Sequence, residues 1–276
     1  MEVHALSLED LSSRLESLVK LESHPVAVKL VRSEGEVEGF KTPSSMGVKL
    51  AVCQAIAMAW RYGWKVALRA EECACSVAKV VFGWSQVELE AFAHSFLKAG
   101  FFKDMCAAVR ASKEAFEQCV LKPNSCLGVA TAPLPKAPWR PDVVLVFCNP
   151  AQAQLLSLGY SYANGDSVEV KYSGKHSSCG YGVVRTYLSR KPTLAPPGGG
   201  DKVFAGCDSN HLIFSTPLEN FKDIVEGVEA VVKAGVIRYP TPLFLRFEPQ
   251  LPGAFKELEA PQAASSRAES SVKDEA

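Results

Sequence analysis

The chain has 276 residues and a mass of 29.8 kDa, which suits one large domain or two small ones. Its 30 Lys and Arg residues balance its 30 Asp and Glu residues, so the formal net charge is zero. This balance disfavours nucleic acid as a partner, because binding to a phosphate backbone relies on surplus positive charge. Nine cysteines in 276 residues are also far too few for a disulfide-stapled scaffold.

The N-terminal segment predicts an amphipathic helix. Leu8, Leu11, Leu15 and Leu18 recur at helical spacing with charged residues between them. The segment lacks the basic start and continuous apolar stretch of a secretory signal. The chain also lacks the roughly 18 consecutive apolar residues that a membrane span requires. We therefore expect a cytoplasmic protein with no membrane partner, whose thiols start out reduced.

The rest of the chain reads as strands alternating with helices. Short apolar segments rich in β-branched residues predict strands at residues 25–31, 65–69, 127–131, 143–147, 167–172, 202–205 and 211–214. Helical periodicity predicts helices at residues 48–62, 75–83, 85–99, 103–120, 149–160, 179–188 and 216–234. This alternation indicates an α/β fold, with a mixed α+β arrangement as the alternative.

We expect one compact domain over residues 1–259 and a disordered tail over 260–276, which has no apolar period. The domain contains a weak internal repeat, called the internal echo below. Gln54 lies early in a predicted helix that is followed by a strand and Cys75, and Gln152 lies early in one followed by a strand and Cys179. The echo is compatible with two related halves, at about residues 25–120 and 127–235.

Five segments carry a family resemblance. They are CQAIA at 53–57, EECACS at 71–76, PDVVLVFCNPAQA at 141–153, SCGYGVV at 178–184 and GDKVFA at 200–205. In this order they resemble the prokaryotic family called domain of unknown function 169, over roughly residues 25–234. The resemblance implies a fold and a set of positions, but no reaction. Cys53, Cys75 and Cys179 match positions where the family commonly has cysteine. The chain departs from the pattern at residues 195–197, Ala-Pro-Pro, where members often have another cysteine.

The same three cysteines share a local context, because each lies at or near a predicted helix start. For Cys75 and Cys179 a predicted strand comes just before. In open α/β sheets, the ends of strands that lead into helices line the ligand crevice. A helix N-terminus also favours the thiolate, which binds metals and attacks electrophiles. These residues could therefore converge on one crevice.

Three functions remain open at this point. In the first, the chain binds an iron–sulfur cluster or zinc and a small molecule, and could perform redox or group-transfer chemistry. Its partner would be a small-molecule ligand or an electron-transfer partner. The expected metal ligands are Cys53, Cys73, Cys75 and Cys179, with Cys148 or Cys207 as an alternate. In the second, the chain is a metal-free small-molecule binding or accessory protein with its cysteines in the core. In the third, it is a thiol-dependent enzyme that uses Cys75 or Cys179.

Other residues are weaker candidates. Gln54 and Gln152 could hydrogen-bond a bound small molecule, or could pair internally with backbone groups. His176 is expected as a solvated loop residue, with a role as ligand or base as the alternative. The glycine-rich segment 196–202 lacks the spacing of a phosphate-binding loop and is expected to be a turn or lid. Cys106 and Cys119, on one predicted helix, are expected to be packing residues.

Overall fold

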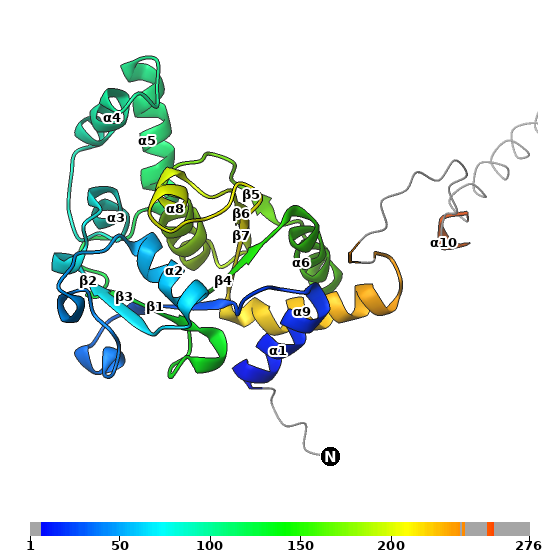
Figure 1. The fold of residues 1–276 in the computed structure, drawn as a ribbon. Coiled ribbons are helices and arrows are strands. Elements are labelled where there is room, and N and C mark those ends of the chain that lie inside the picture. The colour runs from blue at the N-terminus through cyan, green and yellow to red at the C-terminus, as the bar shows by residue number, and fades with distance from the viewer. Residues whose placement is uncertain (1–6, 238, 241–252, 257–276) are drawn as a thin grey trace, which may run out of the picture. The chain divides into compact units, whose positions relative to one another are not determined.

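The computed structural model describes residues 7–237, 239–240 and 253–256. At its centre is a seven-stranded sheet in the order β2-β3-β1-β4-β7-β6-β5, with helices on both faces (Figure 1). The predicted mixed α/β class is therefore confirmed. The predicted disordered tail at 260–276 lies outside the described residues.

The sheet is mostly antiparallel. Its strands are β1 (Val26–Val31), β2 (Val66–Arg69), β3 (Gly128–Pro133), β4 (Val143–Cys148), β5 (Glu169–Val170), β6 (Thr193–Ala195) and β7 (Leu212–Pro217). Each neighbouring pair is antiparallel except β5 with β6. The crevice rule for open parallel sheets, used above for the cysteines, therefore does not apply to most of this sheet.

Side chains of the central strands alternate between two cores. On β4, Val143 and Leu145 join the core under α2 (Val52–Tyr62) and η5 (Ser177–Arg185). Val144 and Val146 point the other way, into the core under α1 (Leu8–Val19), α6 (Pro150–Asn164) and α9 (Leu218–Lys233). Burial on both faces explains why this strand is a continuous apolar run. The two helices of the internal echo, α2 and α6, lie on opposite faces, and the relation between halves stays a prediction.

The remaining helices are short or lie beside the sheet. They are α3 (Ser76–Val81), α4 (Leu89–Lys98), α5 (Met105–Cys119), α7 (Thr186–Ser189) and α8 (Gly199–Val203), with 3-10 turns η1 (Glu34–Val37), η2 (Ser44–Met46), η3 (Ala70–Glu72) and η4 (Leu134–Lys136). Helices α4 and α5 form a pair at the upper left of Figure 1. Phe92 and Phe116 join them, with ring centroids 5.2 Å apart. A second unit begins at residue 241, and its described part is the four-residue helix α10 (Gly253–Lys256).

Two local predictions are wrong. Helix α8 occupies the first two residues of the segment predicted as a strand at 202–205 and a turn follows, because the Asp201 carboxylate accepts a hydrogen bond from the Gly198 N–H and caps the helix. The helix predicted over residues 216–234 begins at Leu218 instead. Thr216 belongs to β7, and its hydroxyl donates to the Pro217 carbonyl. Strand β6 was not predicted.

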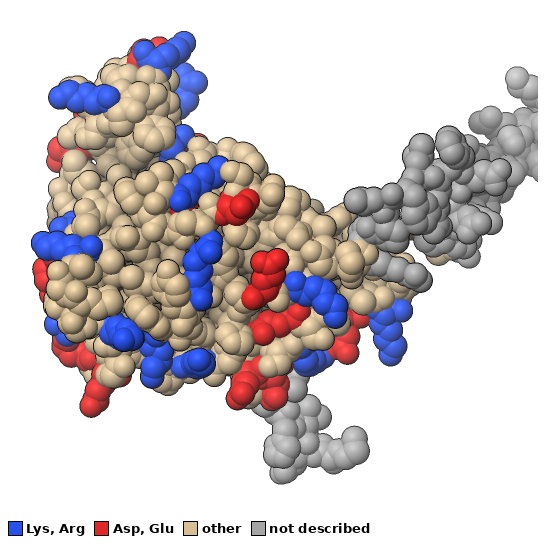
Figure 2. Space-filling view, in the orientation of Figure 1, with Lys and Arg blue, Asp and Glu red and all other residues tan. Residues whose placement is uncertain are grey.

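Lys and Arg side chains are interspersed with Asp and Glu over the face shown in Figure 2, as expected for a chain with zero net charge. Among the described residues, no helix combines the length and the apolar character needed to cross a membrane.

Candidate functional site

Three cysteines from separate segments line one cavity. Cys53, Cys75 and Cys179 share a cavity of about 230 Å³ on the face of the sheet covered by α2 and η5. All three thiols are free. The glycine-rich segment from Gly198 and aromatic side chains, including Phe96 of α4, also line the cavity. The structure therefore brings together three of the four cysteines singled out from the sequence as metal ligands.

Each of the three cysteines lies at the start of a helix, as predicted. Cys53 is the second residue of α2, and its thiol donates to the Gly200 carbonyl at 3.7 Å. Cys75 is the N-cap of α3, where its Sγ accepts the Ala78 N–H at 3.5 Å. Cys179 is the third residue of η5.

Helix η5 is a nine-residue π-helix, a rare conformation that is frequently found at functional sites. His176, its N-cap, has φ of 37°, in the left-handed region that few residues other than glycine adopt. Gly180 lets the imidazole lie against the helix, because a Cβ at this position would be 3.2 Å from the His176 Cδ2. Nothing in the sequence periodicity distinguishes this helix from an ordinary α-helix.

Burial keeps the thiols of Cys53 and Cys179 protonated. It raises the pKa of Cys53 to about 12 and the pKa of Cys179 well above its ordinary value of 9.0. The Asp201 carboxylate and the neighbouring thiols push both pKa values in the same direction. The expectation that helix starts would favour the thiolate is therefore wrong for Cys53 and Cys179, since desolvation outweighs the backbone dipoles.

Asp201 is a site residue that the sequence reasoning did not select. Its side chain lines the cavity and is almost fully buried. The carboxylate accepts the Gly198 N–H at 2.8 Å and also the hydroxyl of Ser178. Burial raises the pKa of Asp201. Asp201 thus links the glycine-rich segment to the start of η5. The only sequence signal for this residue was its place in the segment GDKVFA, which carries part of the family resemblance.

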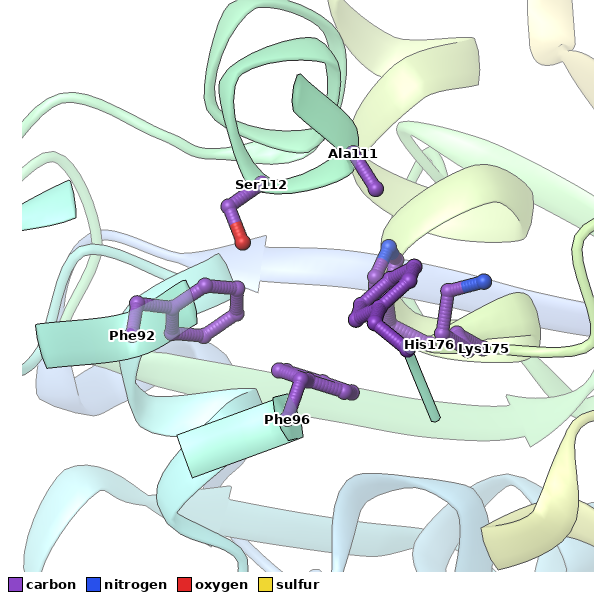
Figure 3. A pocket seen from close by; sticks show the side chains of 7 residues that line it. Phe92, Phe96, Ala111, Ser112, Lys175 and His176 are labelled. Carbon is purple, nitrogen blue, oxygen red and sulfur yellow. The ribbon is translucent and has the colours of Figure 1, made fainter. Parts of the chain in front are cut away.

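His176 is half-buried and not a solvated loop residue as expected. Its ring stacks on Tyr181, with centroids 5.4 Å apart, and meets the edge of Phe96. Burial lowers the pKa of His176 to about 4, so the imidazole is neutral at pH 7. Figure 3 shows the ring beside a second, much smaller gap of about 10 Å³, large enough for one water molecule. Its wall is made of Phe92, Phe96, Phe102, Ala111, Ser112, Lys175 and His176.

The other cysteines lie apart from the cavity wall. Cys73, the fourth predicted ligand, is buried in the core, where its thiol donates to the Cys75 carbonyl at 3.5 Å. Cys148 is in the core on the opposite face of the sheet. Cys207 packs behind Cys53 in a small apolar cluster. Cys119 is buried as predicted, whereas Cys106 is exposed. Within the described ranges, no three His, Cys, Asp or Glu side chains form a group that could hold a metal ion.

Gln54 and Gln152 bond to backbone groups. The Gln54 side chain accepts the Ala51 N–H at 2.9 Å at the start of α2. The Gln152 side chain accepts the Asn149 N–H at 2.8 Å and donates to the carbonyls of Val19 and Lys20, which ties α6 to the end of α1. These contacts correspond to the internal pairing considered above. Gln54 and Gln152 do not line the thiol cavity.

Replacing Gln152 with alanine is expected to destabilise the protein by about 2 kcal/mol, because the buried carbonyl of Val19, the partly buried carbonyl of Lys20 and a helix N-terminal N–H lose their partner. Gln54→Ala is the matched control, since it loses only the helix-start bond and is expected to cost about 1 kcal/mol or less. Urea denaturation of both variants measures the difference. Equal losses would show that the link from α6 to α1 contributes nothing.

Comparisons with known proteins agree with the resemblance. The profile of the DUF169 family, described as "Uncharacterised ArCR", matches residues 14–227. The chain is also similar to an uncharacterized protein of Methanocaldococcus jannaschii, MJ0308, with 26% identity over 221 residues, which cover 79% of this chain and 92% of that protein. No solved structure matches the chain.

Proposed function

This chain belongs to the DUF169 family, and we propose that its thiol cavity holds an iron–sulfur cluster bound by Cys53, Cys75 and Cys179. The observation that carries the proposal is the convergence of these three cysteines, from separate segments, on one cavity. Cysteine thiolates are the usual ligands of such clusters. The family resemblance adds support, because it marks these same three positions as commonly cysteine.

The size of the cavity favours a cluster over a single ion. Zinc bound by cysteine needs its sulfurs to close to about 2.3 Å from one point. A cluster spreads its irons over a volume, so ligands distributed around the wall of a cavity of about 230 Å³ suit it better. Zinc remains the alternative metal.

The protonated thiols of Cys53 and Cys179 must lose their protons when a metal binds. Burial favours the protonated form of a cysteine, but a bound metal cation reverses this preference and deprotonates a thiol that coordinates it. Because burial raises the pKa of Cys53 to about 12, loading releases protons and is favoured by rising pH. The neutral thiols of the metal-free protein are therefore consistent with a metal site.

Three protein ligands would leave one coordination position of a four-iron cluster free, since such clusters usually have four cysteines. The departure at residues 195–197 supports this arrangement. Those residues directly precede Gly198, which lines the cavity, so a cysteine there in other members would join the same set. In this chain a small molecule would take the free position. This is the basis for redox or group-transfer chemistry with an electron-transfer partner.

Anaerobic reconstitution with ferrous iron and sulfide tests the proposal. The expected result is bound iron and sulfide with broad visible absorption, lost in each of the variants Cys53→Ser, Cys75→Ser and Cys179→Ser. Cys73→Ala and Cys106→Ser are the controls and should keep the iron, because neither residue lines the cavity.

Two other results would change the conclusion. Zinc uptake without iron, abolished by the same three substitutions, would keep the thiolate site and replace the cluster with zinc. A colourless protein that takes up neither metal would overturn the proposal.

A metal-free small-molecule binding protein is the second candidate. The observation in its favour is the apolar wall of the same cavity, which Phe96, Phe101 and Phe204 line. For the thiol-dependent enzyme, the raised pKa of Cys179 opposes attack by this residue. Cys75, which also lines the cavity, is the other candidate for this role.

A further inference from the structure

We infer that a second cleft, beside the junction of β4 and α6, binds a small zwitterion of the amino-acid type, up to the size of a short peptide. The cleft has a volume of about 740 Å³ and is lined by residues of this junction, the end of α2, the loop at 206–211 and Glu22. No described residue lines both this cleft and the thiol cavity. The inference therefore goes beyond the proposed function and does not rest on it.

The cleft contains part of a segment that the proposed cluster leaves unused. Segment 141–153, PDVVLVFCNPAQA, is the longest of the five that carry the family resemblance. No residue of this segment is among the described residues that line the thiol cavity. Five of its residues line the second cleft instead, namely Phe147, Cys148, Asn149, Pro150 and Gln152. The longest family-like segment therefore lies at a different cleft from the cluster.

Three charged side chains of both signs line the cleft without neutralising one another. Arg61, Glu22 and Asp208 are all exposed, and among the described residues none of them forms an ion pair. All three nevertheless act on one imidazole. Burial lowers the pKa of His211, the charge of Asp208 raises it, and smaller effects of Arg61 and Glu22 lower and raise it. A ligand with a carboxylate and an ammonium finds an opposite charge for each, whereas a singly charged ligand also meets a like charge.

Arg61 is held in place to receive the carboxylate. Its guanidinium lies over the Trp60 ring, with Cζ 4.2 Å from the centroid, and Nη2 donates to the Gly206 carbonyl. The guanidinium has further N–H groups, whose fork geometry matches a carboxylate. His211 supplies a second donor at this wall. Its Nδ1 accepts the Asp208 N–H at 2.8 Å, so in the neutral ring the proton is on Nε2.

The remaining wall suits an ammonium and an apolar body. Glu22 and Asp208 supply negative charge for the ammonium. Phe147 stacks on Trp60 with centroids 4.2 Å apart, and both rings line the cleft, so an aromatic side chain of the ligand packs well there. The volume lies within the range of about 300–1,000 Å³ that is usual for small-molecule sites. An amino acid and a short peptide share these groups, and the experiment below distinguishes them.

Four probes with one aromatic ring test the charges. Phenylalanine and glycyl-phenylalanine are zwitterions, phenethylamine lacks the carboxylate, and 3-phenylpropionate lacks the ammonium. Calorimetric titrations use the full-length, metal-free, reduced protein at pH 7. We expect the tighter of the two zwitterions to bind at least ten times more tightly than either singly charged probe, and which zwitterion is tighter identifies an amino-acid or a peptide site. Equal binding of a singly charged probe would overturn the inference, as would a failure of both zwitterions to bind.

Arg61→Met tests the carboxylate end, since methionine can still cover the Trp60 ring but carries no charge. Affinity for the tighter zwitterion should fall about tenfold or more, while phenethylamine binds no more weakly than before. Arg110→Met is the matched control, because Arg110 is an exposed arginine of α5 that does not line the cleft. This control should keep full affinity. Melting temperatures confirm that both variants fold, and unchanged binding by Arg61→Met would refute the carboxylate end.

The double variant Glu22→Gln with Asp208→Asn tests the ammonium end. Asparagine keeps an oxygen that can accept the Asn210 N–H, as Asp208 Oδ1 does at 2.9 Å. The double variant should lose most of the preference for the tighter zwitterion over 3-phenylpropionate, and a full preference would refute the ammonium end. Because the cleft contains none of the proposed metal ligands, Cys53→Ser should bind the probes like the original protein, so this test and that of the cluster can fail separately.

Discussion

Replacing Gly227 with alanine is expected to destabilise the folded protein by about 3 kcal/mol or more. Gly227 of α9 packs directly on Gly159 of α6, and a Cβ at Gly227 would lie only 2.1 Å from the Gly159 carbonyl oxygen. The obstacle is backbone and not a flexible side chain, so the two helices would have to move apart. The core that they cover on that face of the sheet would open with them.

Chemical denaturation measures this loss. Gly35→Ala is the matched control, because a Cβ at Gly35 meets no atom within 4 Å and is expected to change the stability by less than about 0.5 kcal/mol. If Gly227→Ala were as stable as Gly35→Ala, the close approach of α6 and α9 would be contradicted.

Alkaline pH is expected to destabilise the metal-free protein steeply. Burial raises the pKa values of Cys53, Cys119, Cys148 and Cys207 to about 12, from an ordinary value of 9.0. Between these values the folded state keeps protons that the unfolded state has lost. The stabilisation is therefore complete below about pH 9 and is lost as pH rises from 9 toward 12. Each such thiol contributes a slope of about 1.4 kcal/mol per pH unit.

Denaturation curves from pH 7 to 10.5 test this dependence, and Cys148→Ala isolates one thiol away from the cavity. The variant should lose stability at pH 7, because it leaves a gap in the core, but its stability should fall less steeply above pH 9. Cys106→Ala changes an exposed thiol and should keep the original slope. A Cys148→Ala slope identical to the original would show that this thiol is not protonated by burial.

The cysteines show how much of the site could be predicted from the sequence. Helix-start context and family position selected Cys53, Cys75 and Cys179, and these line the cavity. Cys73 was added as a fourth ligand on different grounds, because it lies two residues from Cys75. The chain turns between them, since Cys73 ends η3 and Cys75 begins α3, and the turn sends one thiol into the core and the other to the cavity.

The polar groups of the site were harder to predict. His176 was expected to be a solvated loop residue, Ser177 was not singled out, and the glycine-rich segment was expected to be a turn or lid. Their role depends on contacts between distant segments, such as the bond from the Ser178 hydroxyl to Asp201. Their pKa values depend on burial, which is a property of the folded protein. Sequence context predicted thiolates at two positions where the fold keeps thiols.

The sequence by itself determined the alternation of strands and helices, most element positions and the helix starts that carry the three cysteines. It could do so because periodicity, capping and β-branched runs act over a few neighbouring residues. The tertiary structure alone decided the antiparallel order of most of the sheet, the π-helical form of η5 and the choice of thiols that face one cavity. These features arise from packing between segments far apart in the chain, about which local patterns carry no information.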